Sequence, residues 1–243
     1  MRIVRVHVEE ELEVGADIAL AQAQSHYLKH VLRLQPGAAL LLFNGRKSLD
    51  YNAVLVANGK KLSAHIEAAI AVGTEPELAS EIVQGLGRAD HMDWMIQKTT
   101  ELGVSRITLF NAERTQTPMK PVQLQKKMNH WRGVAISACE QSGRALLPEI
   151  SFHTDLTQAL AASTAECKLL LEFEGVSLAS ALERPCAAVS ILLGPEGGLN
   201  PAEIDLAKAT GFEPVSLGPR VLRTETAATS ALAIAQSLIG DMR

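Results

Sequence analysis

The feature that most constrains the fold is an alternation of short apolar runs and longer helix-forming segments through residues 73–243. The run 189–193 is the clearest, because nearly continuous apolar residues are typical of a strand covered on both faces of a sheet. Strands are predicted at 81–85, 106–110, 168–171, 189–193 and 214–217. Helices are predicted at 90–102, 122–139, 156–163, 201–210 and 225–239. This order predicts a mostly parallel α/β domain.

Residues 1–72 have a different pattern, in which short alternating runs are separated by turn signals such as Pro36-Gly37 and Asn44-Gly45. Strands are predicted at 2–8, 38–43, 52–57 and 62–70, and one helix at 21–34. The pattern predicts a small β-barrel-like module. Since 71–76 has the composition of a linker, we expect one domain at residues 1–72 and a second at 73–243.

Composition excludes several other classes of protein. With 47% hydrophobic and 21% charged residues, the chain is neither disordered nor a membrane protein, and the N-terminus lacks the features of a secretory signal. Cys139, Cys167 and Cys186 are too few and too far apart for a disulfide framework or a zinc site. We therefore expect a soluble cytoplasmic protein without a metal site.

The formal net charge of −4 at pH 7 argues against a nucleic-acid partner only as a total. Residues 114–144 carry a net charge of +5, because Glu140 is their only acidic residue. The basic residues of this segment are Arg114, Lys120, Lys126, Lys127, Arg132 and Arg144. A solvated helix face and a phosphate-contacting surface both explain such a segment, and composition does not choose between them.

The segment 193–204 carries the strongest local signal. Asn200, Pro201 and Glu203 have the spacing of a helix cap followed by a capping box. That cap does not require three preceding glycines, at 194, 197 and 198, which let a backbone bend sharply and approach a ligand closely. The segment is therefore either a tight turn or a ligand-binding loop, and its spacing matches neither a dinucleotide nor a triphosphate motif.

A second strand-to-helix loop spans residues 217–228. Thr224 is predicted to cap the following helix. Arg220 and Arg223 are not explained by capping, and either attract an anion or pair with carboxylates such as Glu196 and Glu225. Because loops that follow parallel strands gather at one edge of the sheet, both loops and the strand end at 171–172 are expected to face one crevice.

Several blocks together resemble one family. The run 193–198, followed by 217–227, resembles the cofactor-site motifs of the SPOUT methyltransferases, and within them the RsmE family. The blocks 97–104 and 138–144 are similar to further blocks of that family. The resemblance covers the whole chain, including the N-terminal domain, which in that family is PUA-like and binds RNA.

The resemblance implies methyl transfer from S-adenosylmethionine (SAM) to N3 of a uridine in 16S ribosomal RNA, a deep trefoil knot and a homodimer. The implied SAM-binding residues are Leu171, Glu172, Leu193, Gly194, Pro195, Glu196, Gly197, Gly198, Leu217, Gly218, Arg220, Leu222 and Arg223. For this reaction Arg220 or Arg223 would stabilise a uracil anion or grip a phosphate, and Glu140 or Glu225 would accept the N3 proton.

The expected partner is 16S ribosomal RNA within the small ribosomal subunit. The residues expected to contact it are Arg2, Arg5, His30, Arg33, Arg114, Lys126, Lys127, Arg132 and Arg144. Two alternatives remain: a SPOUT methyltransferase that acts on another RNA, and a non-catalytic RNA-binding protein of ribosome assembly.

Overall fold

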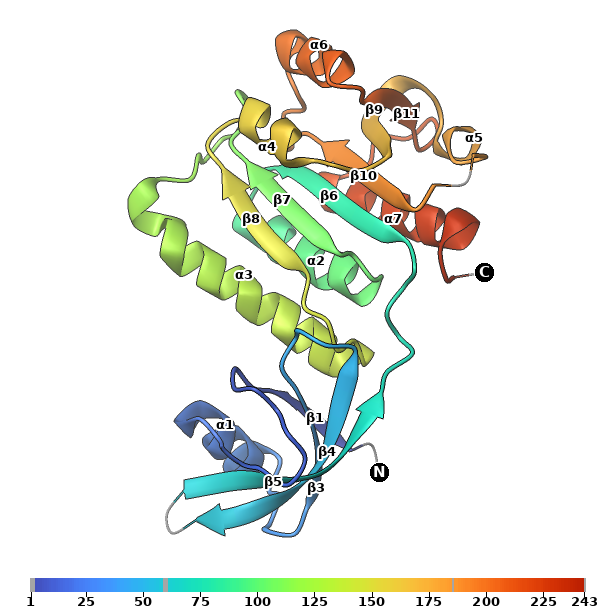
Figure 1. Cartoon of the computed structure of the whole chain (residues 1–243). Helices are drawn as coiled ribbons and strands as arrows, with labels where there is room; N and C mark the ends of the chain where they lie inside the picture. Colours follow the sequence, from blue (N-terminus) through green and yellow to red (C-terminus); the bar gives the residue numbers. More distant parts are fainter. Residues whose placement is uncertain (1–2, 59–60, 185, 243) are drawn as a thin grey trace. The chain divides into compact units, whose positions relative to one another are not determined.

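The computed structural model describes residues 3–58, 61–184 and 186–242, which form two compact units (Figure 1). The N-terminal unit comprises Met1–Glu75 together with Cys139–Leu147, and the C-terminal unit comprises Pro76–Ala138 and Pro148–Arg243. The single domain boundary predicted after residue 72 assigns 139–147 to the C-terminal domain, whereas in the structure this segment belongs to the N-terminal unit. Sequence patterns are local, whereas this segment joins the unit through long-range contacts.

The N-terminal unit contains a five-stranded sheet in the order β1-β3-β4-β5-β2, in which β1 and β3 are parallel and the other neighbours antiparallel. Its strands are β1 (Val4–His7), β2 (Asp17–Ala19), β3 (Ala39–Phe43), β4 (Leu49–Asn58) and β5 (Lys61–Ala71). The helix predicted at 21–34 is shorter and has two parts, α1 (Gln22–His26) and a π-helix, η1 (Tyr27–Val31). The sequence prediction missed β2, which is only three residues long.

Arg5 joins three parts of the N-terminal unit. Its guanidinium donates to both carboxylate oxygens of Asp50, at 3.0 and 2.6 Å, and so links β1 to β4. It also donates to the main-chain oxygens of Cys139, at 2.5 Å, and Arg144, at 3.0 Å. Arg5 is 9% exposed, so the prediction that it contacts RNA is wrong. A buried guanidinium needs such partners because an unpaired buried charge is costly.

Arg144 was also predicted to contact RNA, and this prediction is wrong for the same reason. It is 4% exposed, and its guanidinium donates to Glu75 Oε2 at 3.1 and 3.0 Å. The other oxygen of Glu75 accepts the amides of Ala145 and Leu146, at 2.7 and 2.9 Å. The charge of Arg144 therefore holds 139–147 in the N-terminal unit.

The C-terminal unit is the predicted parallel α/β domain, with six parallel strands in the order β11-β9-β10-β6-β7-β8. The strands are β6 (Ala79–Gly85), β7 (Arg106–Phe110), β8 (Glu149–His153), β9 (Cys167–Ser177), β10 (Ala188–Leu193) and β11 (Glu213–Ser216). The helices that belong wholly or mostly to this unit are α2 (Ala89–Glu101), α3 (Pro121–Ser142), α4 (Leu156–Ala162), α5 (Leu178–Ala181), α6 (Pro201–Ala209) and α7 (Thr224–Ile239). The sequence prediction missed β8, a half-buried edge strand without an apolar run, and the four-residue α5.

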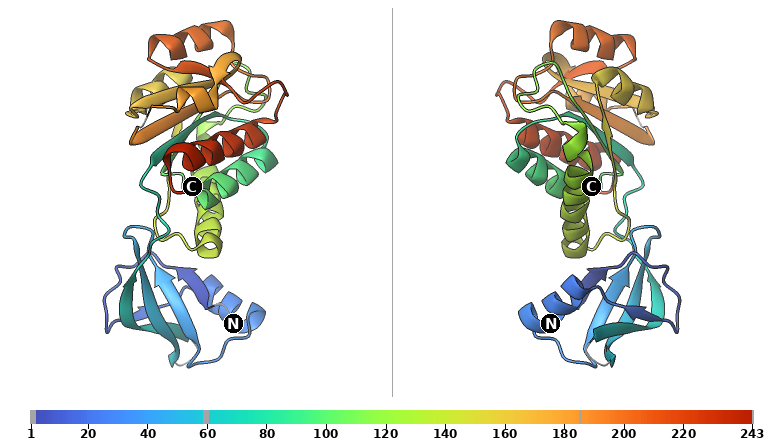
Figure 2. Two further views of the ribbon diagram at one scale, coloured as in Figure 1. Left: turned by 90° about the vertical axis from the view of Figure 1, so that its right-hand side faces the viewer. Right: turned by 90° about the vertical axis from the view of Figure 1, so that its left-hand side faces the viewer.

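The two faces of this sheet bury different cores, because successive side chains of a strand point to opposite faces. Ile82 belongs to the core that includes α2, α5 and α7, whereas its neighbour Val83 belongs to the core that includes α4 and α6. On the first face, α2 and α7 lie side by side (Figure 2). Strands buried on both faces explain the nearly continuous apolar runs of the sequence.

We expect Arg5→Met to destabilise the protein by about 3–5 kcal/mol, because the substitution leaves Asp50 buried without its partner. Urea unfolding followed by circular dichroism measures this loss. The matched control is Arg46→Met, since Arg46 is 53% exposed and pairs with an exposed Glu11, a pair worth about 0–1 kcal/mol. An equal, small effect of both substitutions would contradict the role given to Arg5.

Candidate active site

Loops at the carboxyl ends of the parallel strands form the candidate site. The connection 86–88 follows β6, 111–115 follows β7, 194–200 follows β10 and 217–223 follows β11. The convergence predicted for the loops after β10 and β11 is confirmed by a hydrogen bond of 2.9 Å from the Thr224 hydroxyl to the carbonyl oxygen of Gly194.

Gln84, at the end of β6, fixes these loops to each other. Its fully buried side-chain amide nitrogen lies 2.8 Å from the carbonyl oxygen of Gly85, 2.9 Å from that of Gly194 and 3.0 Å from Thr224 Oγ1. Gln84 was not among the predicted site residues. A carboxamide at the end of a buried strand is the signal that could have indicated it, because a buried polar group needs hydrogen-bond partners.

Thr224 has a different role from the predicted one. The cap of α7 is Arg223, which makes no side-chain capping bond, and Thr224 is the first helical residue. Its hydroxyl donates across to the loop after β10 instead of to its own helix. In contrast, the predicted capping box of α6 is confirmed, with Asn200 and Glu203 each accepting the other's amide at 2.8 Å.

Glu196 anchors the loop after β10 to the connection between β6 and α2. Its Oε1 accepts the Arg88 amide at 2.8 Å and faces His91 Nδ1 at 3.0 Å. Burial alone would raise the pKa of Glu196, but hydrogen bonds from the amides of Arg88 and of Glu196 itself, and from the His91 ring, together lower it. The absence of a side chain at Gly87 lets the Glu196 carboxylate come this close to the backbone, since a Cβ at Gly87 would lie 2.8 Å from Glu196 Oε1.

Glu225, in the first turn of α7, faces the same imidazole. It is 8% exposed, and its buried Oε2 lies 3.6 Å from His91 Nδ1 without a hydrogen bond from any described residue. His91 therefore lies between a carboxylate of the loop after β10 and a carboxylate of α7. His91 was not among the predicted site residues, because no local sequence pattern connects it to Glu196 and Glu225.

Arg220 and Arg223 are both exposed, and their side chains have no hydrogen bond or ion pair within the described ranges 3–58, 61–184 and 186–242. Glu196 and Glu225 face His91 and are not their partners, so the alternative in which these carboxylates neutralise them is wrong. Two guanidiniums thus stand ahead of the N-terminus of α7, where an anion is favoured.

The strand end at Leu171 and Glu172 is a bulge. Leu170 pairs with Pro214 and Val176 with Val215, so residues 171–175 have no counterpart in β11. Leu171 and Glu172 are half-buried in this bulge. Burial raises the pKa of Glu172, and the neighbouring Glu174 raises it further, against the opposing effects of Lys208 and the Phe173 amide.

Glu140 belongs to the N-terminal unit, whereas the loops of the candidate site belong to the C-terminal unit. Its Oε1 accepts the His7 amide at 3.0 Å and so helps to hold β1. Burial raises the pKa of Glu140, although the His7 amide and Arg5 oppose the shift. The Glu140 carboxylate is thus engaged by a hydrogen bond that holds the fold of the N-terminal unit.

Comparison with known proteins identifies the family. The model described as RNA methyltransferase domain matches residues 74–236, and the one described as RNA methyltransferase PUA domain matches residues 20–67. The ribosomal RNA small subunit methyltransferase E of Buchnera aphidicola subsp. Schizaphis graminum is 31% identical over 242 residues, which are 99% of this chain and 98% of the relative. The chain belongs to the RsmE family.

Solved structures agree with this assignment. The ribosomal RNA small subunit methyltransferase E of Neisseria gonorrhoeae, bound to S-adenosylmethionine, has a TM-score of 0.91 and 32% identity, and the match covers 100% of both chains. A methyltransferase structure from Legionella pneumophila with bound SAM has a TM-score of 0.93 and 33% identity over 99% of this chain and 100% of the other. The α/β methyltransferase fold and the PUA-like domain are thus confirmed.

The remaining residues predicted to contact RNA differ in their surroundings. Lys126 and Arg132 are exposed on α3, and the Lys127 amine lies 6.0 Å from the centre of the Trp131 ring. His30 and Arg33 are exposed in or just after η1. Arg114 is exposed but donates to the main-chain oxygens of Gly197 and Leu199, both at 3.2 Å, and so braces the loop after β10. Arg2 lies outside the described residues.

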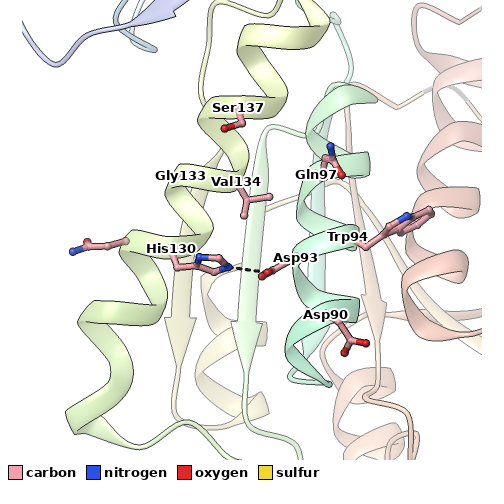
Figure 3. Close-up of a pocket in the computed structure, with 9 residues that line it drawn as sticks. Asp90, Asp93, Trp94, Gln97, His130, Gly133, Val134 and Ser137 are labelled. Carbon is pink, nitrogen blue, oxygen red and sulfur yellow. Dashed lines mark hydrogen bonds and ion pairs between the residues drawn. The ribbon is translucent and has the colours of Figure 1, made fainter. Parts of the chain in front are cut away.

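A groove lies between α2 and α3 and is lined by residues of these two helices (Figure 3). It contains Trp94 and the pair His130–Asp93, whose Nε2 and Oδ2 are 2.8 Å apart. None of the residues predicted for SAM, RNA or catalysis lines it. Among the described residues, no cluster of side chains is suited to a metal ion, and no helix has the length and apolar character to cross a membrane.

We expect Gln84→Leu to lower the free energy of unfolding by about 1–3 kcal/mol, because the substitution removes the hydrogen bonds that this fully buried carboxamide makes to Gly85, Gly194 and Thr224. Urea unfolding measures the loss. The matched control is Gln97→Leu on the exposed side of α2, expected to change stability by at most about 0.5 kcal/mol. Equal stability of the two variants would contradict the role of Gln84.

Proposed function

We propose that this protein transfers a methyl group from SAM to N3 of a uridine in 16S ribosomal RNA of the small subunit. The observation that carries the proposal is the pair of unpartnered guanidiniums, Arg220 and Arg223, beside the loop after β10. Membership in the RsmE family supports a SAM-dependent ribosomal RNA methyltransferase, and the names of the relatives specify the small subunit. The uridine N3 position follows from the motif resemblance.

The backbone of two glycines fits a site that holds SAM. Gly198 has φ +69° and Gly218 has φ +97°, values that residues with side chains rarely adopt. A Cβ added to either would meet no atom within 4 Å, so the backbone is open on that side to a ligand. The residues that would hold SAM are Leu171, Glu172, Leu193, Gly194, Pro195, Gly197, Gly198, Leu217, Gly218, Arg220, Leu222 and Arg223, with Glu196 fixing the loop through its contacts with Arg88 and His91.

When bound, SAM supplies a methyl group on a positively charged sulfur. The part left to the protein is to align the uracil and to manage its N3 proton. Arg220 or Arg223 would stabilise the negative charge that forms on O2 or O4 of the uracil as the proton leaves, or would grip the adjacent phosphate. Because neither guanidinium is engaged by a carboxylate of the described chain, both are free for this role.

We infer that Glu225, rather than Glu140, accepts the N3 proton. Glu225 lies two residues after Arg223, in the first turn of α7 and in the same unit as both glycine loops. Glu140 is engaged by the His7 amide in the N-terminal unit. A proton acceptor must lie within hydrogen-bond reach of the proton that it removes, and the loops that bring the substrate to SAM belong to the unit of Glu225.

The RNA partner would be bound by surface cations of both units. We propose contacts from His30 and Arg33 in the N-terminal unit and from Lys126, Lys127 and Arg132 on α3. With Arg144 buried, the basic surface is smaller than the sequence segment 114–144 indicates. We also propose a homodimer, a trefoil knot in the C-terminal domain and a cytoplasmic location, as the family resemblance implies.

The decisive experiment is mass-spectrometric mapping of methylated nucleosides in ribosomal RNA from a strain that lacks the gene. We expect N3-methyluridine to disappear from 16S RNA and to return when the gene is restored. Its persistence, with loss of a methyl group from another RNA, would indicate a different substrate. If calorimetric titration detected no binding of SAM, the protein would instead be a non-catalytic RNA-binding protein.

Arg223→Ala is expected to lower methyl transfer about 100- to 1,000-fold, because it removes a donor aimed at charge that develops in the transition state. The fold should be unchanged, since Arg223 is exposed and makes no capping bond through its side chain. Transfer of labelled methyl groups to 16S RNA and circular dichroism measure the two effects. Arg184→Ala, at an exposed position outside the candidate site, is the matched control. Near-normal turnover of Arg223→Ala would contradict the proposal.

Reversing the charges at Lys126 and Lys127 to Glu is expected to weaken RNA binding. The slope of log affinity against log salt concentration should fall by about 0.7–0.9 for each RNA phosphate that the variant no longer neutralises. The affinity for SAM should not change, because both residues lie on α3, outside the glycine loops. Filter binding over a salt series provides the measurement, with Arg184→Glu as the control. Unchanged RNA affinity would mean that this part of α3 is only a solvated face.

A further inference from the structure

His91 lies among carboxylates from three elements. Its Nδ1 is 3.0 Å from Glu196 Oε1, in the loop after β10, and 3.6 Å from Glu225 Oε2, in the first turn of α7. Its Nε2 is 3.9 Å from Oδ2 of Asp90, the preceding residue of α2. The side chain of His91 is only 14% exposed, and those of Glu196 and Glu225 are 25% and 11% exposed.

The same ring nitrogen of His91, Nδ1, faces the carboxylates of both Glu196 and Glu225. The proton on Nδ1 donates to Glu196, the nearer carboxylate. Glu225 Oε2 is buried and receives no hydrogen bond from the described chain. Its interaction with His91 is therefore an electrostatic attraction, which requires a positive charge on the ring. A neutral imidazole provides the first interaction without the second, whereas an imidazolium provides both.

We propose that protonated His91 is a positioning residue that ties the loop after β10 to the first turn of α7 and thereby holds the two SAM-binding loops together. This inference rests on the proposed function for its consequence on SAM, but not for the link between the loops. Without the positive charge, Glu196 and Glu225 are two carboxylates facing one uncharged ring, and their mutual repulsion favours separation of the loops.

The strength of the proposed link between the two loops should change with pH, and the surrounding charges determine the direction of the change. The charged groups around the ring are Asp90, Glu196 and Glu225, and Arg88, whose Nε lies 3.5 Å from Asp90. The pKa of Glu196 lies below its ordinary value, so its contribution is present above that value and is lost only as the pH falls through the lowered one. Because the proposed link needs a positive charge on His91, it should weaken as the pH rises, and it should persist at low pH down to the lowered pKa of Glu196.

Three proteins test the link: the wild type, His91→Gln and His91→Lys. Calorimetry of SAM binding should show a wild-type affinity that falls as the pH rises from about 5.5 to 8.5. His91→Gln should bind about tenfold more weakly at the acidic end and show little pH dependence, because a charge-assisted hydrogen bond is lost. His91→Lys keeps a positive charge throughout this range, and should keep a high affinity without the pH dependence.

The control is His130→Gln, which breaks the pair with Asp93 in the groove between α2 and α3 (Figure 3). It should leave both the affinity for SAM and its pH dependence as in the wild type. A His91→Gln variant with the affinity and pH profile of the wild type would overturn the proposal. A general loss of stability would not mimic it, because such a loss would also affect His91→Lys.

Hydrogen exchange of the protein without SAM separates this inference from the proposed function. In the wild type, the amides of 194, 196–198 and 224–228 should exchange faster as the pH rises, beyond the intrinsic change in exchange rate. In His91→Lys they should follow the intrinsic change alone. If the wild type bound no SAM, the proposed function would fail, and the exchange data would still decide the role of His91. Identical exchange in the wild type and His91→Lys would overturn it.

Discussion

The buried carboxamide of Gln84 is the interaction on which the candidate site depends. It joins Gly194 and Thr224, which are 110 and 140 residues away in the sequence. Parallel strands bring their carboxyl ends to one edge, but strand pairing alone does not fix how far apart the following loops lie. Because Gln84 is fully buried, its polar atoms cannot exchange these partners for water. The loop of glycines and the start of α7 are thus positioned by the sheet itself.

Basic residues that look alike in the sequence have three different roles, and the cost of burying charge explains the difference. Arg5 and Arg144 are enclosed, and each has a carboxylate and main-chain groups as partners. Arg114 is exposed, but its guanidinium donates to carbonyl groups of the loop after β10. Arg220 and Arg223 have neither kind of partner in the described chain, which distinguishes residues available to a ligand from those that hold the fold.

The sequence predicts well what is decided locally. The apolar runs of β6, β7 and β10 identify strands covered on both faces, and the cap at Asn200 marks the start of α6. Interactions between distant residues are not predictable in this way. The segment 139–147 belongs to the N-terminal unit because of its contacts with Arg5 and Glu75. The role of His91 depends on two carboxylates that are more than 100 residues away in the sequence.

Two kinds of link therefore join the loop after β10 to α7. The link through Gln84 and Thr224 is made by neutral groups, whose hydrogen bonds do not change with pH. The link through Glu196, His91 and Glu225 is made by ionisable groups. Because the neutral link does not depend on charge, loss of the proposed ionic link would leave the loop after β10 and the start of α7 attached to the sheet through Gln84. The proposed response to pH would therefore be confined to the spacing of these loops.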